Sequence, residues 1–251
     1  MLILKASLFG LLFFVQASYG SYLVCGPDAS AGSRPLIVML HGCDQTAAEF
    51  QRSTEICELA KKEQFHVLFP EQSRARNPIG CWNWYDAKKI EEEAQAVTAT
   101  LQRVFEHKPI DKAKVHVAGI SAGGAFAGYL ASCHSDVFKA GAIHSSPSFL
   151  RARDLNQALR LMKSGRGKVQ KERLCAGFKK APLLVIHGAK DNVVDVKNVD
   201  LLVEDLLDTR SPKPRVVPEL PHAWLGGVPM KYSFPNPIKA TQLLWDFFSS
   251  F

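Results

Sequence analysis

The sequence predicts an α/β fold with a mostly parallel central sheet and helices on both faces. Short apolar runs that favour strands alternate along the chain with longer stretches that favour helices. Runs such as Pro182 to Gly188 are continuously apolar, which is typical of parallel strands buried on both faces. Because ligands of such folds bind at the carboxyl ends of the strands, the residues that follow each run are the first candidates for function.

The expected elements fill one domain. The strands are largely apolar runs of five to seven residues; among the helices, residues 122–133 are rich in Ala and residues 196–207 are amphipathic. At 251 residues and 47% hydrophobic content the chain can bury one large core, and no repeat divides it. Strands are expected at 36–40, 66–70, 115–120, 140–144, 182–188 and 215–220, and helices at 47–63, 90–105, 122–133, 196–207 and 237–248.

A G-x-S-x-G motif, Gly119-Ile120-Ser121-Ala122-Gly123, begins within the third strand. A serine nucleophile in this motif stands on a sharp, strained turn between a buried strand and a helix, where glycines avoid a clash with the backbone. The strand before the turn and the Ala-rich segment after it follow the required order. We therefore expect Ser121 to be a nucleophile; the alternative is a tight turn that carries an ordinary serine.

An acidic residue and then a histidine must follow such a serine along the chain. Asp191 lies in the loop directly after the apolar run 182–188 and is the expected acid. Asp195 is a competitor a few residues further on. Asp200 and Asp205 fall on the amphipathic stretch, where an acidic residue is more often part of a solvated helix face.

His222 is the expected base, because it follows the run 215–220 and is the one histidine after Asp191. Ser121 would attack an ester carbonyl, His222 would carry its proton to the leaving alcohol, and Asp191 would hold the imidazole tautomer. We expect the negative oxygen to bind the backbone N–H of Ala122 and that of Cys43, in the His-Gly-Cys segment after the first strand. The rival histidines are His66, His107, His116 and His134.

Three further histidines, His41, His144 and His187, each stand at the end of a predicted strand and could converge on a metal ion. A turn in which each imidazole packs or hydrogen-bonds locally is the simpler explanation. No carboxylate accompanies them in a recognisable ligand spacing, and no C-x-x-C spacing suggests zinc. We therefore expect no metal and no cofactor.

Residues 1–20 have the features of a cleaved secretory signal peptide. Lys5 precedes the apolar run 6–15, and the small residues Ser18 and Gly20 stand at the minus-three and minus-one positions. The run is short for a bilayer span, so a membrane anchor is the alternative and no stable membrane insertion is expected. Residues 21–251 would then be one catalytic domain, secreted to the extracellular space or the periplasm.

All six cysteines lie beyond this cleavage point, and their even number allows disulfides in an oxidising compartment. We expect a Cys43–Cys81 bridge, because each residue adjoins a loop at the rim of the active site. Cys133, on the helix after the nucleophile, is expected to be free and buried. The cysteines are Cys25, Cys43, Cys57, Cys81, Cys133 and Cys175.

From about residue 35 to its end, the sequence resembles secreted α/β-hydrolase esterases of the polyhydroxybutyrate depolymerase and feruloyl or acetylxylan esterase group. The resemblance implies an α/β-hydrolase fold and a secreted serine carboxylic-ester hydrolase. The combination of motifs is specific. It consists of LHGCDQTAAEF at 40–50, PEQ with NPIGCWNWYD within 70–86, GISAGGA at 119–125, HGAKDNVV at 187–194 and HAWLGG at 222–227.

This resemblance supports the same serine, acid and histidine, and it favours Asp191 over Asp195. It also suggests that Trp84 flanks the ester, while Trp224, close to the histidine, would suit a hydrophobic acyl or aromatic substrate. The alternative for these residues and for Trp82 is ordinary packing in the core or at the rim.

Two departures from the family pattern bear on structure and substrate. Residues 21–33 are short and rich in Gly, Ser and Pro, so we expect the opening hairpin to be truncated. The chain ends just after its last helix, without a linker or a polymer-binding domain. Soluble short-chain esters, hydroxyalkanoate oligomers or feruloyl and acetyl esters are therefore the expected substrates, rather than solid polymer.

The segment 147–181 concentrates positive charge, with ten Lys or Arg residues against Asp154 and Glu172, a net charge of +8 beside +7 for the whole chain. As an insertion between two strands in the position of a lid, it could steer acidic substrates or contact an anionic surface. A solvated helical face is the alternative.

A second class of function follows from this segment. The chain would then be a secreted basic protein that binds anionic polysaccharide or lipid on a hydrolase scaffold, with little or no catalysis. Nucleic acid is not an expected partner, because the segment lacks interleaved aromatic residues for base stacking.

Overall fold

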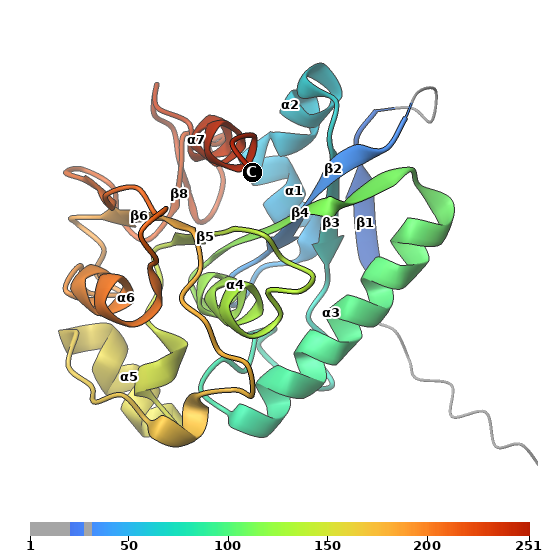
Figure 1. Ribbon diagram of the computed structural model, residues 1–251. Coiled ribbons are helices and arrows are strands. Elements are labelled where there is room, and N and C mark those ends of the chain that lie inside the picture. The colour runs from blue at the N-terminus through green and yellow to red at the C-terminus, as the bar shows by residue number, and fades with distance from the viewer. Residues whose placement is uncertain (1–20, 28–31) are drawn as a thin grey trace, which may run out of the picture.

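The computed structural model describes residues 21–27 and 32–251, so the predicted signal peptide lies outside the described residues. A seven-stranded sheet in the order β1-β3-β2-β4-β5-β6-β7 forms its centre (Figure 1). All neighbouring strands are parallel except β1, which pairs antiparallel with β3. The strands are β1 (Tyr22–Cys25), β2 (Arg34–Leu40), β3 (His66–Pro70), β4 (Ile110–Ile120), β5 (Gly141–His144), β6 (Leu183–Gly188) and β7 (Arg215–Val217).

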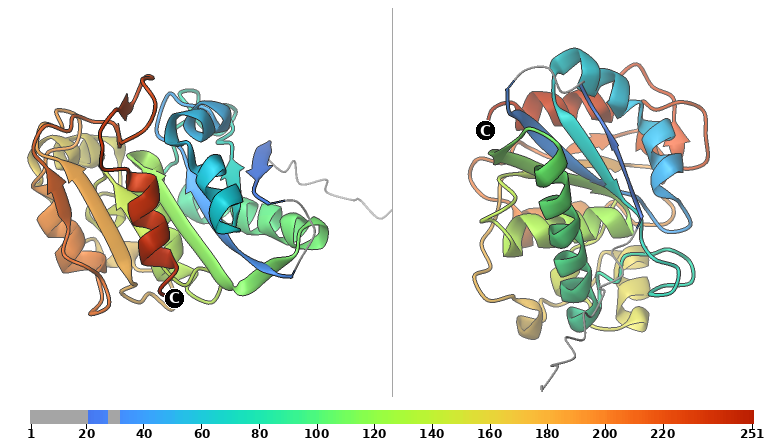
Figure 2. Two further views of the ribbon diagram at one scale, coloured as in Figure 1. Left: turned by 90° about the horizontal axis from the view of Figure 1, so that it is seen from above. Right: turned by 90° about the vertical axis from the view of Figure 1, so that its right-hand side faces the viewer.

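Helices cover both faces of the sheet (Figures 1 and 2). Side chains of β2 alternate between two hydrophobic clusters, as the pleat of a strand requires: Leu36 and Val38 belong to one and Ile37 and Met39 to the other. The predicted α/β fold is therefore confirmed. The first cluster packs under α3 (Ala87–His107), α4 (Ala122–Cys133), α5 (Leu155–Ser164) and α6 (Asn198–Leu206), and the second under α1 (Ala47–Thr54), α2 (Ile56–Glu63) and α7 (Ala240–Phe248).

Several boundaries differ from the sequence prediction. The helix expected at 47–63 is broken at Glu55, whose left-handed φ of 53° separates α1 from α2. The helix expected from residue 90 begins at Ala87, because the Asp86 side chain accepts the N–H groups of the first turn. A small two-stranded sheet, β8 (Trp224–Leu225) with β9 (Ser233–Phe234), was not predicted.

The amino-terminal edge is built by β1, in the region where a truncated hairpin was expected. Its four residues pair with β3 along their whole length, and a Cys25–Cys57 disulfide ties the strand to α2. Since β3 lies between β1 and β2 in the sheet, β1 and β2 do not form a hairpin of neighbouring strands.

Three disulfides engage all six cysteines. The predicted Cys43–Cys81 bridge is confirmed. The prediction of a free Cys133 was wrong: this residue is the last of α4, where the helix meets the segment 147–181, and it bonds to Cys175. The predicted position of Cys133 on the helix was right, but its disulfide partner, Cys175, comes from a loop 42 positions further along the chain.

The basic segment 147–181 is fixed to the body of the protein. Arg151 is buried and pairs with the carboxylate of Asp205 at 2.7 Å, so Asp205 does not belong to a solvated helix face as predicted. The buried guanidinium of Arg173 donates hydrogen bonds to the carbonyls of Phe149 and Trp84. The eight other Lys and Arg residues of the segment are exposed.

Candidate active site

The nucleophile candidate stands on the turn between β4 and α4. Ser121 has φ 57° and ψ −125°, a region that L-residues rarely adopt and that marks a strained turn. A Cβ atom on Gly119 would overlap the backbone of Gly123, and one on Gly123 would overlap the carbonyl groups of Leu40 and His41. Both glycines are therefore required by close backbone contact, as the motif predicts.

An acid and a base meet beside this turn. His222 Nδ1 lies 2.8 Å from Asp191 Oδ2, and because a carboxylate only accepts, Nδ1 carries the proton. Asp191 Oδ1 accepts the backbone N–H groups of Val193 and Val194 at 2.9 and 2.8 Å. Burial alone would raise the pKa of Asp191, but the bond from His222 and these N–H groups hold it below its usual value. The carboxylate thus stays ionised.

The competing acids take no part in this contact. Asp195 accepts the backbone N–H of Lys197 at 2.9 Å, and Asp200 is exposed on α6. The structure therefore brings Asp191, and not Asp195, to His222.

The two oxyanion-hole candidates are the backbone N–H groups of Cys43, which lines the pocket of Ser121, and of Ala122, the residue after Ser121. In the loop after β2, the N–H of Gly42 donates to Gln45 Oε1 and that of Asp44 to the carbonyl of Ile79, both at 2.9 Å. Among the described residues the Cys43 N–H has no such partner, and Cys43 lines the pocket that contains Ser121. Ala122 is the first residue of α4, where N–H groups have no partner within the helix.

The loop after β3, residues 71–86, holds the segment of His41 and Cys43 in place. Trp82 Nε1 donates to the His41 carbonyl at 3.1 Å, and Cys81 forms the disulfide to Cys43. The loop is anchored in turn by the buried Glu93 of α3, which accepts hydrogen bonds from the Gln72 side chain and the Asn83 backbone at 2.6 and 2.9 Å. Burial raises the pKa of Glu93 despite these bonds.

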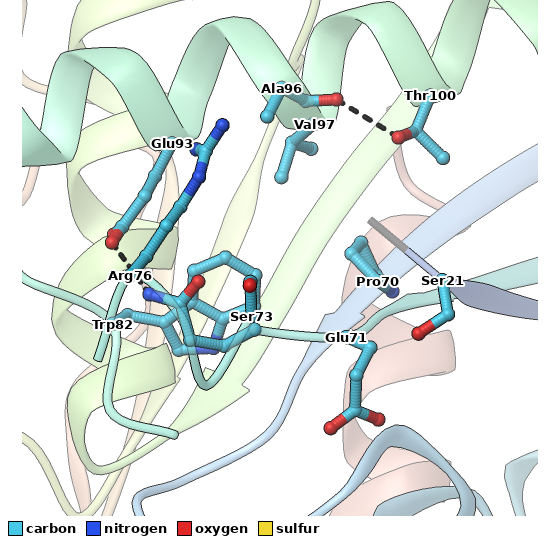
Figure 3. A pocket seen from close by; sticks show the side chains of 11 residues that line it. Ser21, Pro70, Glu71, Ser73, Arg76, Trp82, Glu93, Ala96, Val97 and Thr100 are labelled. Carbon is cyan, nitrogen blue, oxygen red and sulfur yellow. Dashed lines mark hydrogen bonds between the residues drawn. The ribbon is translucent and has the colours of Figure 1, made fainter. Parts of the chain in front are cut away.

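Figure 3 shows Glu93 and Trp82 on the wall of a pocket of about 180 Å³ between α3 and this loop. None of the three catalytic candidates lines it. The side-chain polar groups of Glu93 and Gln72 hydrogen-bond to each other and do not point into the pocket as free donors or acceptors. We therefore assign this pocket no part in the reaction.

Two of the three catalytic candidates, Ser121 and His222, line a second pocket of about 180 Å³, and Asp191 is linked to it through its bond to His222. The wall of this pocket includes four residues that the sequence motifs did not predict, namely Gln45, Met162, Val193 and Tyr232. Val193 is two residues from Asp191 and could have been suspected, whereas Met162 and Tyr232 come from α5 and the loop before β9 and carried no motif. The lining residues are Gly42, Cys43, Gln45, Ile120, Ser121, Met162, Val193, His222 and Tyr232.

The tryptophans lie outside this pocket. Trp224 is 1% exposed, packs edge-on against Phe50 and stacks on His144. Trp84 is 4% exposed and belongs to the core cluster beneath α3 and α4, as Trp82 does. A substrate-binding role for Trp84 and Trp224 stays a prediction that none of these contacts supports.

Each of the strand-end histidines is engaged by its own backbone partner. His41, His144 and His187 each hydrogen-bond to the backbone of a different loop. Within residues 21–27 and 32–251, no group of three or more His, Cys, Asp or Glu residues is placed to hold a metal ion. In the same ranges no helix has the length and apolar character needed to cross a membrane.

The sheet order, the turn at Ser121 and the positions of Asp191 and His222 after β6 and β7 define an α/β-hydrolase fold. The chain belongs to the family described as esterase PHB depolymerase, whose model matches residues 17–211. The resemblance seen in the sequence motifs is thereby confirmed.

Among curated proteins, the chain is 28% identical over 189 residues to poly(3-hydroxyalkanoate) depolymerase C of Paucimonas lemoignei, covering 71% of this chain and 45% of that protein. It is 26% identical over 127 residues to feruloyl esterase B of Thermothelomyces thermophilus, covering 49% and 43% respectively. The chain thus spans less than half the length of these relatives. An acetyl xylan esterase from Aspergillus awamori has the same fold, with a TM-score of 0.71, 14% identity and coverage of 91% of this chain and 93% of that chain.

Proposed function

We propose that this protein is a serine carboxylic-ester hydrolase that uses Ser121, His222 and Asp191. The observation that carries the proposal is the 2.8 Å bond between His222 and Asp191 at a pocket that also contains Ser121. Family membership supports the same activity. No cofactor is part of the proposal.

In the proposed reaction the Ser121 hydroxyl attacks the ester carbonyl carbon while His222 Nε2 takes its proton. The tetrahedral intermediate places its negative oxygen near the N–H groups of Cys43 and Ala122. His222 then gives the proton to the leaving alcohol, which departs as the carbon–oxygen bond breaks. Water, deprotonated by His222, attacks the carbonyl carbon of the resulting acyl-serine. The bond from that carbon to Ser121 Oγ then breaks, His222 returns the proton to Ser121, and the acid leaves.

The pocket favours esters with a short acyl group. Its volume of about 180 Å³ is below the roughly 300–1,000 Å³ of sites that enclose drug-sized ligands. Ile120, Met162 and Val193 give it an apolar wall, whereas Gln45 and Tyr232 offer polar groups. We therefore propose acetyl and short hydroxyalkanoyl esters as better substrates than feruloyl esters.

Hydrolysis of p-nitrophenyl acetate and butyrate tests the activity. The parent protein should turn over both, and Ser121→Ala should lose at least about 10⁴-fold in kcat while its circular dichroism stays unchanged. Ser132→Ala is the matched control, because Ser132 lies on α4, is fully buried and has no hydrogen-bond partner for its hydroxyl in the described structure. Equal turnover by parent and Ser121→Ala would refute the proposal.

A surface role for the segment 147–181 is the second candidate. Leu155 and Leu159 on α5 are 54% and 49% exposed, and Met162, on the same face of the helix, reaches the pocket. Arg160, on the same helix, and Arg166, just after its end, are exposed as well. An apolar strip with basic neighbours suits contact with an anionic lipid surface next to the site.

We propose secretion as well, since three disulfides are typical of oxidising compartments.

Vesicles test this contact. The protein should bind phosphatidylglycerol vesicles more strongly than phosphatidylcholine vesicles, lose the difference at high salt, and retain binding in Ser121→Ala. Arg160→Glu with Arg166→Glu should weaken binding more than Lys61→Glu with Lys62→Glu, an exposed pair on α2. Equal binding to both vesicle types at low salt would contradict the proposal.

A further inference from the structure

Three buried histidines lie at or just beyond the carboxyl ends of β2, β5 and β6, the first two of which flank β4, the strand before Ser121. His41 follows β2, His144 ends β5 and His187 lies near the end of β6, and the sheet order places β4 between β2 and β5. Their exposed fractions are 0, 2 and 0%. The reaction proposed above uses none of them.

His41 controls the direction of a peptide unit in the oxyanion loop. Its Nε2 lies 3.1 Å from the backbone N–H of Gln72 and accepts from it, so Nδ1 carries the proton and donates to the Gly42 carbonyl at 2.8 Å. That carbonyl and the Cys43 N–H belong to one planar trans peptide and point in opposite directions. Holding the carbonyl therefore aims the Cys43 N–H away from the imidazole.

His187 closes the loop that carries the acid. Its Nε2 donates to the Val194 carbonyl at 2.8 Å, while the N–H of Val194 donates to Asp191 Oδ1. The same Nε2 lies 3.6 Å from Asp191 Oδ2, the atom that bonds to His222. The imidazole therefore fixes the residue that orients the carboxylate.

His144 connects the nucleophile to the loop of the base. Its carbonyl accepts the Ser121 N–H at 2.9 Å, and its Nε2 accepts the Leu225 N–H at 3.2 Å. Nδ1 then carries the proton and faces Ser145 Oγ at 3.1 Å. The ring also stacks on Trp224, two residues after His222, with centroids 5.0 Å apart.

We propose that His41, His144 and His187 are positioning residues, each of which holds one of the three loops that assemble around Ser121. The proposal rests on the esterase function proposed above. The two bonds in which Nε2 accepts an N–H require neutral imidazole, and burial lowers the pKa of all three rings, that of His144 to about 3. The rings are therefore neutral at the pH where the proposed triad operates.

Leucine variants of the three histidines, beside His116→Leu, test the proposal. His116 is a matched control, because it is 1% exposed in β4 and its ring, in the part of the chain that the structure describes, stacks on Phe248 of α7 and not on a catalytic loop. Each positioning variant should lose about ten- to a hundredfold in kcat with little change in KM, as small misplacements of catalytic groups do. His116→Leu should keep its kcat, whatever its thermal stability.

Two further measurements separate positioning from stability. His187→Gln can donate from its amide nitrogen to the Val194 carbonyl, so it should recover most of the kcat that His187→Leu loses. The low-field proton resonance of the Asp191–His222 hydrogen bond should weaken in His187→Leu and persist in His41→Leu, although kcat falls in both. This resonance needs no turnover, so it tests the inference even where a leucine variant is inactive.

The outcomes distinguish the two proposals. A folded but inactive parent would refute the esterase function, and the resonance would still report whether His187 orders the loop. An active parent whose three leucine variants match it in kcat would overturn the inference. So would an equal loss of kcat in His116→Leu, or an Asp191–His222 resonance that His187→Leu leaves unchanged.

Discussion

The two sides of the catalytic pocket are built differently. On one side, the loop after β2 is held by a disulfide, by the indole N–H of Trp82 and by the amide of Gln45, which together fix its backbone. On the other side, the segment 147–181 contributes Met162 to the pocket and exposes eight basic residues. The segment 147–181 is also fixed, by the Cys133–Cys175 disulfide and by Arg151, so the difference lies in its exposed charge. We propose that the loop after β2 serves the chemistry and that the charged segment influences which molecules approach the site.

The largest expected effect is a loss of kcat when Asp191, in the loop after β6, is changed. Asp191→Asn should keep the fold but favour the wrong imidazole tautomer, which in a triad costs about 10⁴-fold in kcat. Asp195→Asn is the control, because Asp195 bonds to the backbone of Lys197 and should change kcat by less than about threefold. Steady-state hydrolysis of p-nitrophenyl butyrate measures both. A comparable loss in the two variants would show that the acid is wrongly assigned.

Changes in the basic segment 147–181 should alter the unfolding free energy more than they alter kcat. Arg151→Met leaves the buried Asp205 carboxylate without its main partner, and breaking a buried pair costs about 3–5 kcal/mol of unfolding free energy. Adding Asp205→Leu should recover most of this cost, because an apolar pair replaces the ionic one. Urea unfolding gives the values. A large loss of kcat in the folded double variant would mean that this side also shapes the chemistry.

A smaller effect is expected at Gln45. Gln45→Leu leaves the Gly42 N–H without its partner beside the Cys43 N–H, so the loop should shift and kcat should fall about ten- to a hundredfold. Gln51→Leu, on α1 and outside the pocket wall, is the control. Steady-state kcat and KM for an acetyl ester, determined separately, measure the loss. If only KM rises, Gln45 acts through binding and not through the oxyanion loop.

The smallest expected effect is the change of the unfolding free energy with pH that the titration of His144 causes. The pKa of His144 is about 3 in the folded protein and about 6.5 in the unfolded chain, so between these values only the unfolded chain binds the proton. The free energy of unfolding should therefore fall as the pH drops, by about 1.4 kcal/mol per pH unit for this residue. Burial lowers the pKa of His116 to about 4, which acts in the same sense.

His144→Gln removes this titration, and urea unfolding at a series of pH values should show the slope reduced by about that amount. Asp191, whose folded pKa is lowered, loses its stabilising contribution only below its unfolded value of about 3.9. An unchanged slope between pH 6.5 and 4 would show that His144 is already charged in the folded protein.

The sequence predicted the parts of the fold that local patterns control. Apolar runs located the buried parallel strands, and the glycines at 119 and 123 located the turn at Ser121. Asp205 was predicted to be solvated, which was wrong. An amphipathic pattern cannot show that Arg151, 54 positions away in the sequence, pairs with Asp205 at the end of α6 and buries it. Tyr232 was missed because residues 228–236 have neither helical nor strand periodicity, and only the pairing of β8 with β9 brings them to the pocket.

The most direct test of the assembled site is reaction with an alkyl p-nitrophenyl phosphonate, which serine hydrolases attack as they attack an ester. Release of p-nitrophenol and mass spectrometry of the digested protein would give the stoichiometry and the labelled residue. We expect one adduct per chain, on Ser121, formed far more slowly in His222→Ala than in the control Lys61→Ala, because Lys61 is an exposed residue of α2. A folded protein that forms no adduct, or one labelled at another serine, would contradict this expectation.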